Sequence, residues 1–134
     1  MNTGRGFAAA GAALAFLAVA AGAFGAHLLE GRVSPNALDI FETAVRYQMY
    51  HAGGLLLVGV MIGRSAAAAF VWAGKLFLAG TIVFSGSLYL LVISGWSWLG
   101  AVAPLGGLCL LGGWATLCWA LLTLPALRQA AESS

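Results

Sequence analysis

The chain has 134 residues, of which 62% are apolar and 7% are charged, and its formal net charge is +2. Soluble domains carry about 25% charged residues, so this sequence has too few polar side chains to cover a water-facing surface. No basic run is present that could follow a phosphate backbone, and nucleic acid is therefore excluded as an expected partner. With a mean hydropathy of +0.97, the chain is predicted to be one integral membrane domain, residues 1–134, whose main partner is the lipid bilayer.

Four apolar segments predict an all-α fold, an integral membrane four-helix bundle with short loops. Each segment has about the 20 residues that a helix needs to cross a hydrocarbon core of roughly 30 Å. Helices are expected because a segment within lipid must satisfy its own backbone hydrogen bonds, whereas a closed barrel would need alternating strands. The predicted spans cover about residues 6–29, 44–63, 76–93 and 99–124.

The first segment carries small residues at alternating steps of four and three, which place them on one helix face. A second helix can approach closely over such a face. A cleavable signal peptide is the alternative, because Arg5 precedes the apolar run, although a signal core has only about 7–15 residues. The residues predicted to pack against another helix are Gly11, Ala15, Ala18, Gly22 and Gly25 in this segment, with Gly59 and Gly63 in the second.

The second segment is preceded by a helix-start pattern. Ser34 and Pro35 provide a side-chain cap followed by proline at the first helical position. A helix from Pro35 to Gly63 would be about 43 Å long, which is more than the hydrocarbon requires. Its first turns are therefore predicted to form an interfacial helical extension before the second span.

Polar side chains gather on this extension. Glu42 and Arg46 have the i, i+4 spacing of an ion pair, and they are expected to form one. Their face is expected to point toward the end of the first helix. One interpretation is an interfacial helix entering the membrane; the other is a functional site, since ionisable groups inside a bundle are functional candidates. The candidate polar cluster comprises His27, Glu42, Arg46, Tyr47, Tyr50 and His51.

The third and fourth segments contain few side chains that could bind a ligand or take part in a reaction. Ser85, Ser87 and Tyr89 could line a polar path, or could bond to backbone groups and neighbouring helices. Cys109 and Cys118 are nine residues apart and face opposite ways on a helix, so neither a disulfide nor a shared metal is expected. No catalytic residue, metal ligand set or cofactor is predicted.

The threading follows from the basic residues, which are enriched on the cytoplasmic side of membrane proteins. Four of them would lie on one side of the predicted bundle and two on the other, which places both termini in the cytoplasm. The first set is Arg5, Arg64, Lys75 and Arg128, and the second is Arg32 and Arg46.

Four motifs in order resemble one protein family. They are GAFGAH at residues 22–27, FETAVRYQMYHA at 41–52, FSGSLYLL at 84–91 and PLGG at 104–107. The sequence resembles the domain-of-unknown-function 423 family (DUF423), relatives of eukaryotic transmembrane protein 256. The resemblance implies a multi-pass bacterial inner-membrane protein with four spans and a retained first helix, and it carries no established activity. Leu28 departs from the glycine that the family often has after the histidine.

Three classes of function remain open, besides an enzyme of unrecognised type. A non-enzymatic accessory or assembly protein, associating with another membrane protein or with itself, is favoured by the small-residue faces. A small carrier or channel with a polar site at the outer mouth is the alternative, but the first, third and fourth apolar segments contain no acidic residue. The third class is haem or metal binding through His27 and His51.

Overall fold

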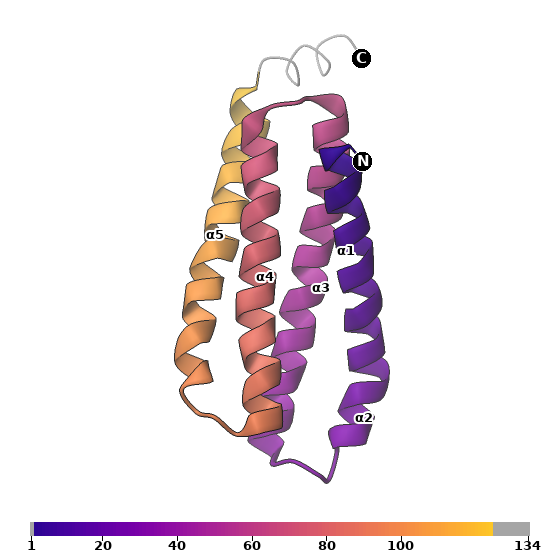
Figure 1. Cartoon of the computed structure of the whole chain (residues 1–134), viewed down its shortest axis with the longest axis vertical. Helices are drawn as coiled ribbons and strands as arrows, with labels where there is room; N and C mark the ends of the chain where they lie inside the picture. The colour runs from indigo at the N-terminus through magenta and orange to yellow at the C-terminus, as the bar shows by residue number, and fades with distance from the viewer. Residues whose placement is uncertain (1, 125–134) are drawn as a thin grey trace.

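The structure, a computed structural model, describes residues 2–124, and four long helical rods make up this part (Figure 1). The first rod is α1 (Thr3–Ala20), which continues through a π-helical turn η1 (Ala21–Gly25) into the short α2 (Ala26–Leu29). The others are α3 (Pro35–Arg64), α4 (Ala68–Ser94) and α5 (Leu99–Thr123). The predicted all-α four-helix bundle with short loops is confirmed.

Local sequence determines where these helices begin and end. The backbone N–H of Ala37 donates to Ser34 Oγ at 3.1 Å, and Pro35 is the first residue of α3. The predicted extension before the second span is therefore part of one unbroken helix. α4 ends at Ser94 and is followed by Gly95, whose φ of +73° is a left-handed conformation that glycine adopts without a steric penalty. α4 begins at Ala68, about two turns before the third predicted span, because a helix can extend beyond the hydrocarbon.

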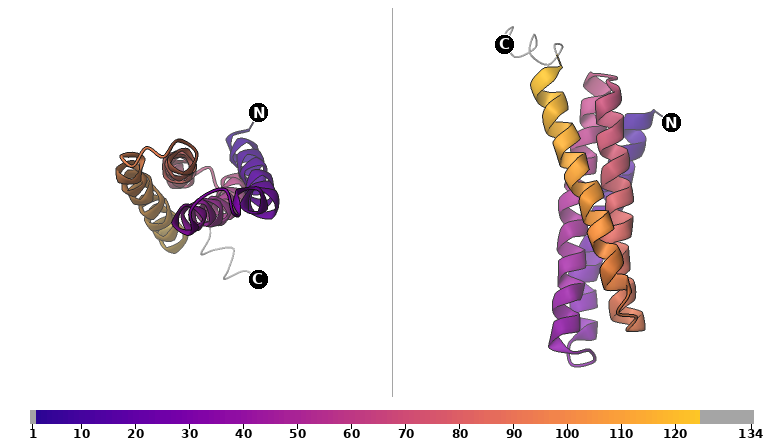
Figure 2. Two further views of the ribbon diagram at one scale, coloured as in Figure 1. Left: turned by 90° about the horizontal axis from the view of Figure 1, so that it is seen from below. Right: turned by 90° about the vertical axis from the view of Figure 1, so that its left-hand side faces the viewer.

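The rods run alternately up and down, and their packing order is a row. α1 packs on α3, α3 on α4, and α4 on α5 (Figures 1 and 2). The α3–α4 pair is thus the centre, with α1 and α5 on different sides of it. The apolar core lies among α3, α4 and α5 and includes Leu55, Val58, Phe70, Phe77, Leu110 and Leu117.

The small residues of α1 lie where it meets α3. A Cβ atom added to Gly59 would stand 2.7 Å from the carbonyl oxygen of Gly4 and 2.8 Å from Cβ of Ala8. One added to Gly11 would stand 2.7 Å from the carbonyl oxygen of Ala52. All three distances are shorter than real Cβ contacts, so the two backbones approach as closely as glycine permits.

The remaining predicted packing residues differ in their surroundings. Ala18 is buried and Ala15 is half-buried, while Gly22 and Gly25 face Val45 and Phe41 of α3. The prediction that Gly63 packs against another helix is wrong, because no atom lies within 4 Å of the Cβ position built on it. The physical reason is length: α1 begins at Thr3, level with Gly59, so Gly63 extends one turn beyond it.

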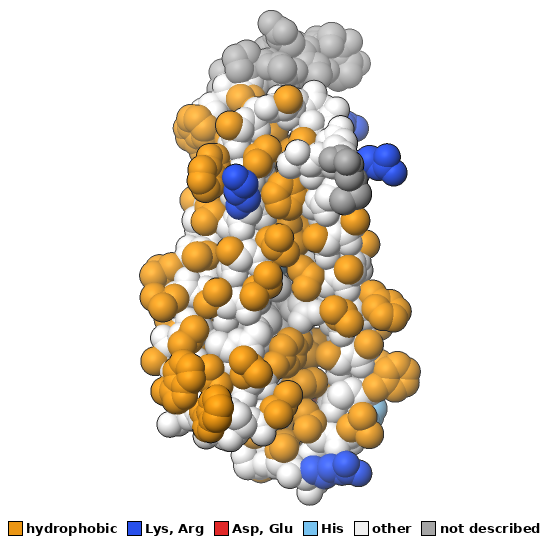
Figure 3. Space-filling model, in the orientation of Figure 1, with side chains coloured by type: hydrophobic (Ala, Val, Ile, Leu, Met, Phe, Trp, Pro, Cys, Tyr) orange, Lys and Arg blue, Asp and Glu red, His pale blue; other side chains and the backbone are white. Residues whose placement is uncertain are grey.

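The surface fits a lipid environment. Figure 3 shows hydrophobic side chains over most of the visible face, with Lys and Arg toward its two ends. Within residues 2–124, three helical segments are long and apolar enough to cross a membrane by length and composition: Thr3–Leu29, Ala68–Ser94 and Leu99–Thr123. α3 is not among them, because polar residues such as Arg46, Gln48 and His51 lower its hydropathy, yet it lies alongside its neighbours (Figure 1).

Candidate functional site

The residues predicted as one polar cluster are divided between two sides of α3. Glu42 and Arg46 line a small depression beside Gly22 and Ala26. Tyr47, Tyr50 and His51 line a different cavity, on the side of α5. Glu42 and His51 are nine residues apart, and at about 100° per residue this places them on opposite sides of the helix. The polar side chains of α3 spread over too much of its circumference to face a single neighbouring helix.

The predicted ion pair between Glu42 and Arg46 is wrong. Among residues 2–124 the structure records one side-chain contact with ion-pair spacing, between His27 Nδ1 and Glu30 Oε2 at 3.8 Å, and this contact is an ion pair only when His27 is protonated. Glu42 and Arg46 are both exposed. Ion pairs between exposed side chains contribute only about 0–1 kcal/mol, so little favours holding these two together.

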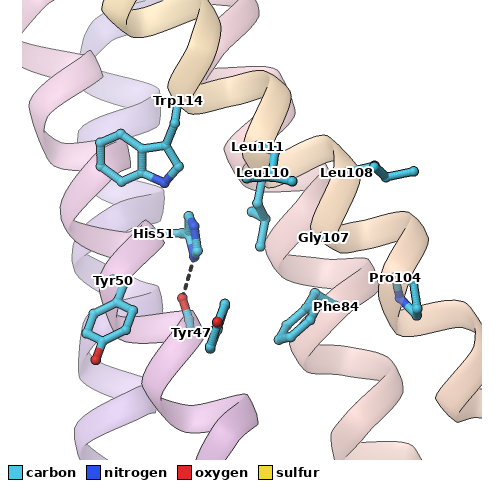
Figure 4. Close-up of a pocket in the computed structure, with 10 residues that line it drawn as sticks. All are labelled: Tyr47, Tyr50, His51, Phe84, Pro104, Gly107, Leu108, Leu110, Leu111 and Trp114. Atoms are coloured by element: carbon cyan, nitrogen blue, oxygen red, sulfur yellow. Dashed lines mark hydrogen bonds between the residues drawn. The ribbon is translucent and has the colours of Figure 1, made fainter.

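His51 is the buried polar group of the α5 side. The residue is only 5% exposed, and its Nδ1 lies 2.6 Å from the backbone carbonyl oxygen of Tyr47 (Figure 4). A carbonyl oxygen can only accept a hydrogen bond, so Nδ1 must donate its proton there. In the neutral imidazole, Nε2 is then an acceptor, and no other described residue donates to it.

Aromatic rings surround this imidazole. The ring centroids of Phe77, Trp114 and Tyr47 lie 5.8, 6.0 and 6.1 Å from that of His51. The ring centroid of Phe84 lies 4.7 Å from that of Tyr47. His51, Tyr47, Phe84 and Trp114 line a cavity of about 590 Å³, here called the α3–α5 groove, and Phe77 packs against His51 from the bundle core. It is lined by Tyr47, Tyr50, His51, Phe84, Pro104, Gly107, Leu108, Leu110, Leu111 and Trp114.

Sequence reasoning missed a second polar arrangement, on the α1 side of α3. Gln48 Nε2 donates to the carbonyl oxygen of Leu14 at 2.8 Å, and Tyr89 Oη donates to Gln48 Oε1 at 2.9 Å. Ser85 Oγ donates to the carbonyl oxygen of Ala44 at 2.8 Å. These bonds connect α1, α3 and α4. The available clue was Gln48 itself, a glutamine on the otherwise apolar side of the helical wheel.

The same bonds bear on the predicted polar path along α4. Ser85 and Tyr89 are engaged with α3, and Ser87 Oγ donates to the carbonyl oxygen of Phe84 within its own helix at 2.9 Å. The hydroxyl groups of Ser85 and Tyr89 therefore take part in helix packing, and that of Ser87 is satisfied within α4. They do not present a continuous polar surface.

The two histidines are not brought together. Gly25 lies against Phe41, so His27 is level with the first turns of α3. His51 is ten residues beyond Phe41, about 15 Å along the helix axis. His27 is exposed, and among residues 2–124 no group of three or more His, Cys, Asp or Glu is placed to hold a metal ion. A metal or haem shared by His27 and His51 is inconsistent with this geometry.

Comparison with known proteins assigns the family. A family model described as "Protein of unknown function (DUF423)" matches residues 21–107, more than half of the chain. The chain belongs to the DUF423 family. The matched range begins at η1, contains His51, and ends within α5.

Two curated relatives of this DUF423 chain come from bacteria. "UPF0382 membrane protein SH2409" of Staphylococcus haemolyticus is 45% identical over 80% of this chain and 87% of its own length. "UPF0382 membrane protein YwdK" of Bacillus subtilis is 46% identical over 78% and 85%. These names confirm the membrane class and state no activity. No solved structure matches the chain.

Proposed function

We propose that this DUF423 protein is a non-enzymatic accessory protein of the bacterial inner membrane, and that it binds a membrane component in the α3–α5 groove. The observation that carries the proposal is His51, a nearly buried imidazole with an unpaired acceptor in a cavity lined mainly by aromatic and aliphatic side chains. A polar group in such a place is unfavourable unless something pairs with it. A bound component would supply that partner.

The carrier alternative has less support. A carrier needs polar groups that accompany its substrate across the bilayer. The hydroxyls of Ser85, Ser87 and Tyr89 are engaged in hydrogen bonds, and Glu42 is exposed near the beginning of α3. Binding without transport is therefore the function that the geometry supports best.

We propose the threading on the basis of charge and arrangement. All four rods cross the bilayer, α3 included, because α3 lies along α1 and α4. The beginning of α1, the α3–α4 connection and the end of α5 share one end of the bundle (Figure 1). Arg5 and Arg64 belong to that end and Arg32 to the other, which favours cytoplasmic termini. Arg128, which contributes to the same prediction, lies outside the described residues.

The groove can be tested by site-specific photo-crosslinking in native membranes. A photoreactive amino acid replaces Leu111, which lines the groove, or Leu105, which is on α5 outside it. The two leucines are a matched pair, since they are 68% and 61% exposed. We expect a discrete adduct of defined mass from position 111 and none from position 105. The absence of an adduct at 111, or the same adduct at both positions, would overturn the proposal.

A further inference from the structure

We infer that the α3–α5 groove binds a lipid-soluble aromatic alcohol of the hydroquinone class, a flat ring that carries hydroxyl groups and an apolar tail. This inference rests on the proposed function and names the chemical class of the occupant. Three features of the groove support it: the hydrogen-bonding groups, their depth along the bundle and the aromatic walls.

The hydrogen-bonding groups of the groove fit a hydroxyl. His51 presents Nε2 as an acceptor, because Nδ1 is committed to the carbonyl of Tyr47. Trp114 presents an indole N–H, which can only donate, on the side facing His51 (Figure 4). The structure records no hydrogen bond from a described residue to His51 Nε2, and none from Trp114 Nε1 to a described residue. One hydroxyl placed between them could donate to His51 and accept from Trp114.

The depth of His51 limits the source of that hydroxyl. His51 is sixteen residues from the start of α3 at Pro35 and thirteen from its end at Arg64. These separations correspond to about 24 Å and 20 Å along the axis. Phospholipid headgroups lie outside a hydrocarbon core of about 30 Å, so they do not reach the middle of the helix. The hydroxyl must therefore belong to a molecule that dissolves in the hydrocarbon.

The aromatic walls favour a flat ring. Tyr47, Phe84 and Trp114 line the groove with π faces and edges, which stack well on another aromatic ring. The cavity of about 590 Å³ lies within the range of roughly 300–1,000 Å³ that small-molecule sites occupy. Leu108 and Leu111, both exposed on α5, line the groove and offer an apolar surface for the tail.

The test compares one probe in two oxidation states. The full chain, with every tryptophan except Trp114 replaced by phenylalanine, is placed in nanodiscs of phosphatidylethanolamine and phosphatidylglycerol. A decyl-tailed benzohydroquinone, kept reduced under argon, and the corresponding benzoquinone are titrated, and dissociation constants are obtained from quenching of Trp114. The quinone has acceptors and no hydroxyl donor. We expect the hydroquinone to bind about fivefold more tightly, the factor that one net hydrogen bond provides.

His51→Phe identifies the residue responsible. This change keeps an aromatic ring and removes Nε2, so hydroquinone affinity should fall to that of the quinone, and quinone affinity should stay the same. Equal affinities for the two probes in the parent protein would overturn the inference, and that comparison needs no His51 variant to fold. A preference for hydroquinone that survives His51→Phe would also overturn it.

A groove-filling pair separates this inference from the proposed function. Leu111→Trp should abolish binding of both probes, and Leu105→Trp should leave it unchanged; because each change adds a tryptophan, bound probe is measured here by mass spectrometry of washed nanodiscs and not by fluorescence. If Leu111→Trp still binds the probes, they bind outside the groove and the inference fails. If photo-crosslinking at position 111 yields a specific adduct but neither probe binds, the inference fails and the proposed function stands. If no adduct and no binding are found, both fail.

Discussion

Thr81 is a buried residue of α4 whose hydroxyl is unused. It is 2% exposed, and Oγ1 has no hydrogen-bond partner among the described residues. An unsatisfied buried polar group is destabilising by about 1–3 kcal/mol. Thr81→Val keeps the branched shape and removes the hydroxyl. We expect this change to raise the free energy of unfolding by about 1 kcal/mol, measured by denaturation in detergent micelles.

Thr116 provides the matched control on α5. Its Oγ1 donates to the carbonyl oxygen of Gly112 at 2.7 Å, so Thr116→Val removes a hydrogen bond that exists. We expect Thr116→Val to leave the free energy of unfolding unchanged or to lower it slightly. If both valine variants change stability by the same amount, the unpaired hydroxyl of Thr81 has no energetic consequence.

Part of the site could be predicted from the sequence at the scale of single residues. The spacing of Glu42 and His51 places them on opposite sides of α3, and this division follows from the helical repeat alone. The helix that covers each side could not be predicted, because it depends on the packing order of the bundle. Gln48 is a visible exception to the apolar pattern on its side of the helix, but its partners Leu14 and Tyr89 come from two other helices, so the pattern alone does not predict them.

The contact between α1 and α3 is the element whose energetics are easiest to test. Gly59→Ala would place a methyl group 2.7 Å from the carbonyl oxygen of Gly4, which is backbone and cannot move aside. Forcing extra methyl groups into a packed interface typically costs about 1–3 kcal/mol. We expect Gly59→Ala to lower the free energy of unfolding by that amount, measured by the same detergent denaturation.

Gly63, on the same helix, separates packing from helix propensity. Its added Cβ position has open space around it, so Gly63→Ala adds only the preference of alanine for helix, about 0.5–1 kcal/mol in a helix interior. This variant should be neutral or slightly more stable. A Gly59→Ala variant that is as stable as Gly63→Ala would contradict the close approach of α1 and α3.

Helix boundaries were more predictable than helix contacts. The cap at Ser34 and the proline after it mark the start of α3 by local chemistry, and the structure begins that helix at Pro35. The predicted contact of Gly63 failed for a non-local reason, because it depends on where α1 begins. The ion pair of Glu42 and Arg46 failed because exposed charges gain little from pairing.

At the scale of the whole molecule, hydropathy predicts the number of helices but not their row-like order. α1 and α5 cover different sides of the α3–α4 pair (Figure 2). The α3–α5 groove lies over Phe84 of α4, bordered by residues of α3 and α5. The groove exists because of the order in which the helices pack, and that order cannot be predicted from any single segment of the sequence.

The proposed threading predicts which connections face the outside of the cell. With Cys109 and Cys118 replaced by alanine, single cysteines are placed at Ser97, in the α4–α5 connection, or at Ser65, in the α3–α4 connection. A membrane-impermeant thiol reagent should label Ser97→Cys in intact spheroplasts and Ser65→Cys only after lysis. Labelling of Ser65→Cys in intact spheroplasts, and of Ser97→Cys only after lysis, would show that the termini face the outside and would contradict the proposed threading.

The central claim is that the α3–α5 groove holds a membrane component. Native mass spectrometry of the protein released from its own membranes measures this directly. We predict a bound species of one defined mass on the unmodified chain and on Leu105→Trp, and its loss from Leu111→Trp, in which the indole occupies the groove. Equal retention by Leu105→Trp and Leu111→Trp, or no bound species on the unmodified chain, would contradict the account.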